Sequence, residues 1–168
     1  QLAFSARQSR LWAKAHRDTP WGDLGGYVEA DFFANDSAGA SYEPRLRHAY
    51  ATVAGLTAGQ TYTTFMNVAA APESNDDHGP VGMLNVRQPL LRWTTTLPVG
   101  DLHLALEDAE TVLAAGALRV APDDERVPDL AARLDVRGDT WQWSIAALAR
   151  ELRSDAPLAG LGTDAHWG

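Results

Sequence analysis

The sequence predicts an all-β protein, an antiparallel transmembrane β-barrel meander. Three observations support this: apolar and polar residues alternate, the alternating segments are about 8 to 12 residues long, and the connections between them are alternately short and long. Such segments exceed the usual strand of a soluble sheet and suit a tilted strand that crosses a bilayer. Because transmembrane barrels have short turns at one end and long loops at the other, the connections favour a barrel.

Four strands are expected in the first half of the chain. Residues 7–17 carry apolar side chains at odd positions, and residues 24–33 carry them at even positions after a Pro-Trp-Gly turn. Residues 45–54 and 58–65 follow, joined by a tight Gly-Leu link. About eight strands are expected in all.

Four more strands are expected in the second half of the chain. Residues 86–96 and 102–110 are joined by a short connection, and residues 130–137 and 140–153 by a Gly-Asp hairpin. The long connections are residues 34–44, 66–85 and 111–129. All short links therefore fall at one end of the predicted sheet and all long ones at the other.

The alternation assigns each strand an apolar outer face and a polar inner face. In residues 45–54 it places Leu46, His48 and Tyr50 outward, and in residues 141–149 it places the odd positions outward. The inward cations are Arg10, Lys14, Arg45, Arg47, Arg92, Arg133, Arg137 and Arg150, and the inward acids are Glu29, Asp31, Glu107 and Asp135. The inner face then has four excess positive charges in a chain of net charge −8, which favours anions along a narrow aqueous path.

Composition excludes several classes of function. The net charge of −8 argues against nucleic acid as a partner, and the absence of Cys excludes disulfides, thiol catalysis and Cys-ligated metal sites. No signature of a hydrolase, metalloprotease or nucleotide-binding protein occurs, so we expect no enzyme, no catalytic residues and no cofactor. His78 beside Asp76 and Asp77 is interpreted as part of a solvated acidic loop, not as a metal site.

Three linked segments of the sequence carry a resemblance to a known family. They are QSRLWAKAHRDTPWGDLGGYVEADFF, PRLRHAYATVAGLTAGQTYTTF and PESNDDHGPVGMLNVRQPLLRWTT. Together they resemble the DcaP-like porins of the Gram-negative outer membrane, closely over residues 6–110 and loosely beyond. The resemblance implies a homotrimer of roughly 16-stranded barrels, embedded in outer-membrane lipid, that carries out ion transport by passive diffusion of small anionic solutes such as dicarboxylates.

The resemblance also implies roles for parts of this chain. Residues 1–168 would form one partial barrel domain, about half of the whole, and the missing initiator Met and Gly-rich end agree with a fragment. Residues 66–85 would fold into the lumen as a constriction loop whose acids, Glu73, Asp76 and Asp77, face the inward cations. The expected pore-lining residues are Arg10, Lys14, Arg45, Arg47, Arg92, Arg133 and Arg137.

Two further readings of the chain stay open. One is a non-transporting membrane barrel or anchor in which eight strands close by themselves around a plugged interior. The other is a soluble β-rich domain that binds carbohydrate through its Trp residues, or a soluble α+β fold, because residues 102–118 and 143–153 also place Leu and Ala at helical spacing. Aromatic residues near strand ends favour a membrane barrel, where they form interfacial girdles; these are Trp21, Trp93, Trp141 and Tyr42.

Overall fold

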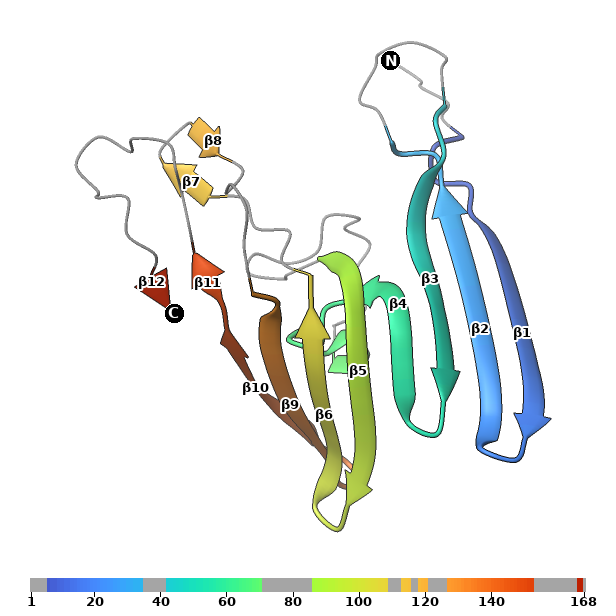
Figure 1. The fold of residues 1–168 in the computed structure, drawn as a ribbon, viewed down its shortest axis with the longest axis vertical. Helices are drawn as coiled ribbons and strands as arrows, with labels where there is room; N and C mark the ends of the chain where they lie inside the picture. The colour runs from blue at the N-terminus through green and yellow to red at the C-terminus, as the bar shows by residue number, and fades with distance from the viewer. Residues whose placement is uncertain are drawn as a thin grey trace.

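In the computed structural model of the chain, eight long strands form one antiparallel sheet in the order β1-β2-β3-β4-β5-β6-β9-β10 (Figure 1). The strands are β1 (Leu11–Thr19), β2 (Gly22–Asp31), β3 (Arg45–Val53), β4 (Leu56–Tyr62), β5 (Arg87–Leu97), β6 (Gly100–Glu107), β9 (Asp129–Arg137) and β10 (Gln142–Ala149). The structure describes residues 6–34, 42–70, 86–108, 113–115, 118–120, 127–152 and 166–167. The predicted antiparallel meander is confirmed.

The remaining described elements are short. They are the 3-10 turn η1 (Val68–Ala70), the hairpin of β7 (Leu113–Ala115) with β8 (Leu118–Val120), and the pair β11 (Glu151–Leu152) with β12 (His166–Trp167). The helical alternative is wrong, because residues 102–107 and 143–149 are strands. No helix in the described part of the chain is long and apolar enough to cross a membrane.

The two faces of the sheet have inverted burial compared with a soluble protein. Leu11 and Ile145 are 66% and 65% exposed on the apolar outer face, whereas Gln88 and Glu107 are 2% and 0% exposed on the polar inner face. The cross-strand registers keep this division through the sheet, because outward residues pair with outward residues, as Leu91 does with Leu106. The described residues therefore form no apolar core between two layers.

The register between β2 and β3 corrects one assignment from the sequence. Glu29 pairs with His48, but the next residue, Ala30, pairs with Leu46, so Arg47 is the extra residue of a β-bulge. Because Arg47 is inserted, the alternation is reversed from His48 onward, and His48 and Tyr50 lie on the inner face. The prediction that these two residues point outward is wrong, because regular alternation counts no inserted residue.

The short turns and the long connections lie at opposite ends of the sheet, as predicted (Figure 1). The β3–β4 turn is the tightest, with Ala54 at φ 49° and Gly55 at φ 82°, the left-handed geometry of a type I′ hairpin. A Cβ on Gly55 would lie 2.5 Å from the carbonyl oxygen of Thr94 on β5. Gly55 is therefore required both by its dihedral angle and by the close approach of β5.

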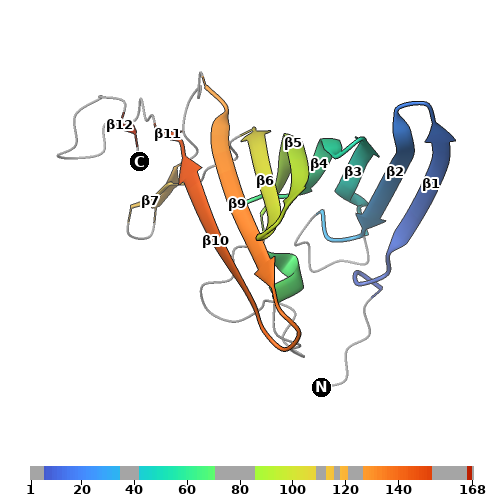
Figure 2. The ribbon, with the colours of Figure 1, turned by 90° about the horizontal axis from the view of Figure 1, so that it is seen from below.

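The sheet curves but does not close (Figure 2). Among the described strands, β1 and β10 lie at the two ends of the strand order and do not pair with each other. Each of these two strands pairs with a strand of this sheet along one edge only. The alternative of eight strands that close into a small barrel by themselves is therefore wrong for this structure.

We predict that Gly55→Val destabilises the protein by about 1–3 kcal/mol, because Val is strained at this φ and its Cβ meets a backbone oxygen. The matched control is Gly26→Val on the outer face, where a Cβ has nothing within 4 Å and where we expect a change within about 0.5 kcal/mol. Urea unfolding of the full-length protein in lipid vesicles measures both. Equal unfolding midpoints for the two variants would contradict the turn assignment.

Candidate functional site: the polar inner face

The inner face is the candidate site because it collects nearly all of the ionic contacts of the described residues. One cross-strand row of this face shows how seven of the eight strands contribute to it. The row runs through Lys14, Tyr27, Tyr50, Gly59, Leu90, Glu107 and Asp129. Its neighbours along each strand complete a surface of charged, hydroxyl and amide side chains.

An ion-pair network ties β2 to β3 near the end that carries the long loops. Arg45 Nη2 lies 2.7 Å from Asp31 Oδ2, and Arg47 bridges Glu29 at 2.5 Å and Asp31 at 2.9 Å. The hydroxyl of Tyr27 donates a hydrogen bond of 2.5 Å to the second oxygen of Glu29. Arg47 is nearly buried, and its charge is compensated by two acids of the neighbouring strand.

Arg45 and Arg47 thus form their salt bridges with acids of β2. The partners expected from the sequence, Glu73, Asp76 and Asp77, lie outside the described residues. The two arginines do lie beside acids, as expected for two like charges that would otherwise repel each other on one face. The nearest acids on the folded sheet are those of the adjacent strand.

After β4 the chain leaves the sheet and crosses the inner face as a segment that we name the inner arm, Thr63–Ala70. Its first contact is Glu107 on β6, which accepts hydrogen bonds from the Thr63 hydroxyl at 2.5 Å and the Thr64 amide at 2.6 Å. Gln88 Nε2 donates a third bond, of 2.6 Å, to the same carboxylate. A fully buried acid is thereby satisfied by three donors, two of them from the inner arm.

The far part of the inner arm is bound by β9 and β10. Arg133 Nη1 donates to the carbonyl oxygens of Thr64, at 2.7 Å, and Met66. Asp135 accepts from Asn67 Nδ2 at 3.2 Å and forms a salt bridge of 3.0 Å with Arg133. The arm therefore crosses from β4 to β9 by side-chain contacts that strand alternation does not reveal.

The inner arm overlaps the first five residues of the predicted constriction loop, residues 66–85. Its residues 66–70 lie on the inner face, and Gln142 Nε2 of β10 donates a bond of 3.1 Å to the Ala69 carbonyl oxygen. The inner arm begins at Thr63, a residue that the alternation had assigned to a strand. Residues 71–85 lie outside the described part of the chain.

The inner face carries more acids than the alternation indicated. The registers add Asp18, Asp23, Asp101 and Asp129 to the four predicted acids. Asp129 is fully buried and pairs with Arg150, and Asp101 accepts a hydrogen bond of 2.8 Å from the Thr96 hydroxyl. The expected excess of four positive charges is therefore wrong for the described wall, where eight acids face the eight predicted cations.

Arg92 differs from the other arginines at mid-strand on the inner face, Arg47 and Arg133. It is half-buried, and it forms no hydrogen bond or salt bridge with another described residue. Its cross-strand partners are Thr57 on β4 and Ala105 on β6, which carry no charge. Arg92 is therefore a cation on the inner face that is not paired directly with an acid, although the Glu107 carboxylate on β6 lies close enough to act on it electrostatically.

The other predicted pore-lining cations lie at the margins of the same face. Lys14 pairs with Tyr27 across β1 and β2, Arg10 immediately precedes β1, and Arg137 ends β9 near its turn. All three are exposed and form no salt bridge with a described residue. The predicted pore-lining set thus divides into cations paired with acids, which are Arg45, Arg47 and Arg133, and unpaired cations, which are Arg10, Lys14, Arg92 and Arg137.

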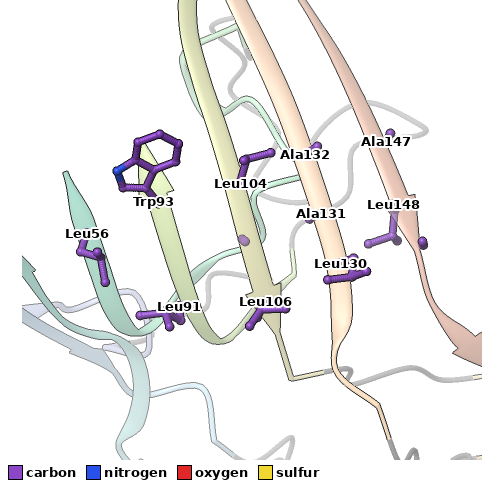
Figure 3. A pocket seen from close by; sticks show the side chains of 12 residues that line it. Leu56, Leu91, Trp93, Leu104, Leu106, Leu130, Ala131, Ala132, Ala147 and Leu148 are labelled. Carbon is purple, nitrogen blue, oxygen red and sulfur yellow. The ribbon is translucent and has the colours of Figure 1, made fainter. Parts of the chain in front are cut away.

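An apolar hollow of about 590 Å³ lies over β4–β6, β9 and β10 (Figure 3). Leu91, Leu106 and Leu130 on the outer face border it, and its other lining residues are Leu, Ala and Trp. It holds no charged side chain that would orient a polar solute. We therefore regard it as part of the apolar outer surface, separate from the candidate site.

These features define the class of the protein. A curved antiparallel meander with an exposed apolar outer face, an ion-paired inner face and short turns at one end is part of the wall of a membrane-spanning β-barrel. The exposed Trp21 and Trp141 lie at the short turns, where girdle aromatics meet the membrane interface.

The chain belongs to the DcaP outer membrane protein family, whose model matches residues 1–153. It is an outer-membrane protein, as the sequence predicted. The crystal structure of the outer membrane channel DcaP of Acinetobacter baumannii has a similar fold, with a TM-score of 0.78 and 24% sequence identity. The match covers 97% of this chain and 45% of that chain. No curated protein matches the sequence.

We predict that Glu107→Gln destabilises the folded protein by about 1–3 kcal/mol, because the new amide places donors against the donors of Thr63, Thr64 and Gln88. Asp101→Asn on the same strand is the control. Because the partner of Asp101 is exposed, we expect a change within about 0.5 kcal/mol. Urea unfolding in lipid vesicles, followed by Trp fluorescence, compares the two. A control variant that is as unstable as Glu107→Gln would contradict the role of the inner arm contacts.

Proposed function

We propose that the chain forms part of the wall of a porin-type channel for the passive diffusion of small solutes, with anions preferred. The observation that carries this proposal is Arg92, a half-buried cation on the inner face with no acid directly opposite it on either neighbouring strand and no salt bridge with a described residue. In a narrow aqueous path bounded by low-dielectric material, one such charge attracts anions strongly. The channel needs no catalytic residue and no cofactor.

The inner arm gives this channel its narrow section. It occupies part of the inner side over β5, β6 and β9, at the level of Glu107 and Arg133. A polypeptide segment held against the wall reduces the open cross-section, so the field of nearby Arg92 acts over a short distance. We propose that residues 66–85 continue this constriction.

The preferred solutes in this proposal are small dicarboxylates. Unpaired cations, Lys14 and Arg92 among them, offer charge-assisted contacts to carboxylates, and exposure to water keeps these contacts weak enough for release. The salt-bridged Arg45 and Arg47 contribute less to the attraction of solutes, because Asp31 and Glu29 offset their charges. We also propose that the whole protein is a homotrimer, as the family resemblance implies.

We predict that Arg92→Gln lowers the preference for anions over cations, because it removes the unpaired charge beside the inner arm. Arg137→Gln is the matched control: it removes one charge from the same face near the turn end of β9, and we expect a much smaller change. Reversal potentials of the full-length protein in planar bilayers under a dilute KCl gradient measure the preference. The difference should vanish at about 1 M salt, where the Debye length is roughly 3 Å.

Two results would contradict the proposal. Equal reversal potentials for wild type and Arg92→Gln in dilute salt would mean that this residue does not set the selectivity. A correctly folded protein that produces no conductance would favour the non-transporting membrane barrel, whose interior is closed by side chains and the inner arm.

A further inference from the structure

Aromatic rings lie side by side on the inner face of β1–β4. The centroids of Trp12 and Tyr27 are 6.5 Å apart, those of Tyr27 and Tyr50 are 5.6 Å apart, and those of His48 and Tyr62 are 4.9 Å apart. We name these five residues the aromatic row. The described inner positions of β5, β6, β9 and β10 carry no Phe, Tyr or Trp. The aromatic row is thus confined to one side of the candidate channel.

The position of the aromatic row differs from that of an interfacial girdle. Girdle aromatics face lipid, whereas the rings of this row share their face with Glu29 and Arg47. Trp12 is opposite Glu29 across β1 and β2, so its exposed ring lies on the inner side, while the hydroxyl of Tyr27 is already bonded to Glu29. The part of the row that remains available to a solute is therefore the apolar surface of its rings.

Cations flank this ring surface on β1. Lys14 is opposite Tyr27, and Arg10 precedes Trp12 by two residues, so all share one face of the strand. Neither cation forms a salt bridge with a described acid. A solute with an apolar ring face and one carboxylate would contact the indole and a cation together.

We propose that the aromatic row is a subsite for acidic sugars of the hexuronate type, a class beyond the dicarboxylates of the proposed function, on which this inference rests. The C–H face of the pyranose packs on Trp12, and the carboxylate is held by Lys14 or Arg10. Hydroxyl groups of the sugar both donate and accept, as does the hydroxyl of Tyr50 in the row, which forms no hydrogen bond with another described residue.

The test uses glucuronate as the probe, with the full-length protein in planar bilayers. We expect glucuronate to interrupt the current transiently. Trp12→Ala should weaken this block about fivefold or more, and Trp12→Phe, which keeps an aromatic ring, should restore most of it. The matched control is Trp143→Ala, which removes an exposed Trp from the outer face and should leave the block unchanged. Lys14→Gln should weaken the block by glucuronate more than any block by glucose.

Several outcomes would overturn the subsite. Glucuronate block that is equal in wild type and Trp12→Ala would do so, and so would Trp12-dependent block by benzoate or succinate that is as strong as that by glucuronate. An anion-selective channel without any glucuronate block would overturn the subsite and leave the proposed function standing. A folded protein without conductance would overturn both.

Discussion

A charge that leaves water must find a partner, and this constraint organises the inner face of the sheet. The large exposed apolar side chains of the sheet lie mainly outside, so the described strands have no apolar core between layers to hold them in place. Buried acids take its place: Asp31 holds two arginines of β3, Glu107 holds the inner arm and β5, and Asp135 holds Arg133. Breaking one such contact leaves a buried charge without a partner, so the ionic network stabilises the wall as a unit.

The same network decides which charges remain for a solute. Arg133 uses its donors on Asp135 and on the carbonyl oxygens of the inner arm, so its role is to position the arm. Arg92 has no such partner among the described residues, although it lies one inner-face position along β5 from Thr94, whose hydroxyl contacts His103. Ion-paired cations and the cations proposed to attract solutes thus share one surface, and they differ in whether they form a salt bridge with an acid of the described wall.

Much of the fold was predictable from sequence because the period of a strand is simple. Two-residue alternation located the long strands, and turn residues located the short links. The errors have local causes. One inserted residue at Arg47 reversed the faces of His48 and Tyr50, and Asp101 was missed because the expected strand began after it. The inner arm was placed in a strand at Thr63 because its sequence continues the pattern of β4, while contacts with distant β6 draw it away.

Cys labelling measures directly whether the inner face borders water and the outer face borders lipid, because residues 1–168 contain no native Cys. Ser144 and Ile145 are consecutive, exposed residues of β10 on opposite faces. Single Cys variants at these positions of the full-length protein, embedded in a bilayer, can be treated with a charged, water-soluble thiol reagent. We predict that the Ser144→Cys variant reacts rapidly, with a change in current, and that the Ile145→Cys variant does not react. Rapid reaction of the Ile145→Cys variant alone would contradict this prediction.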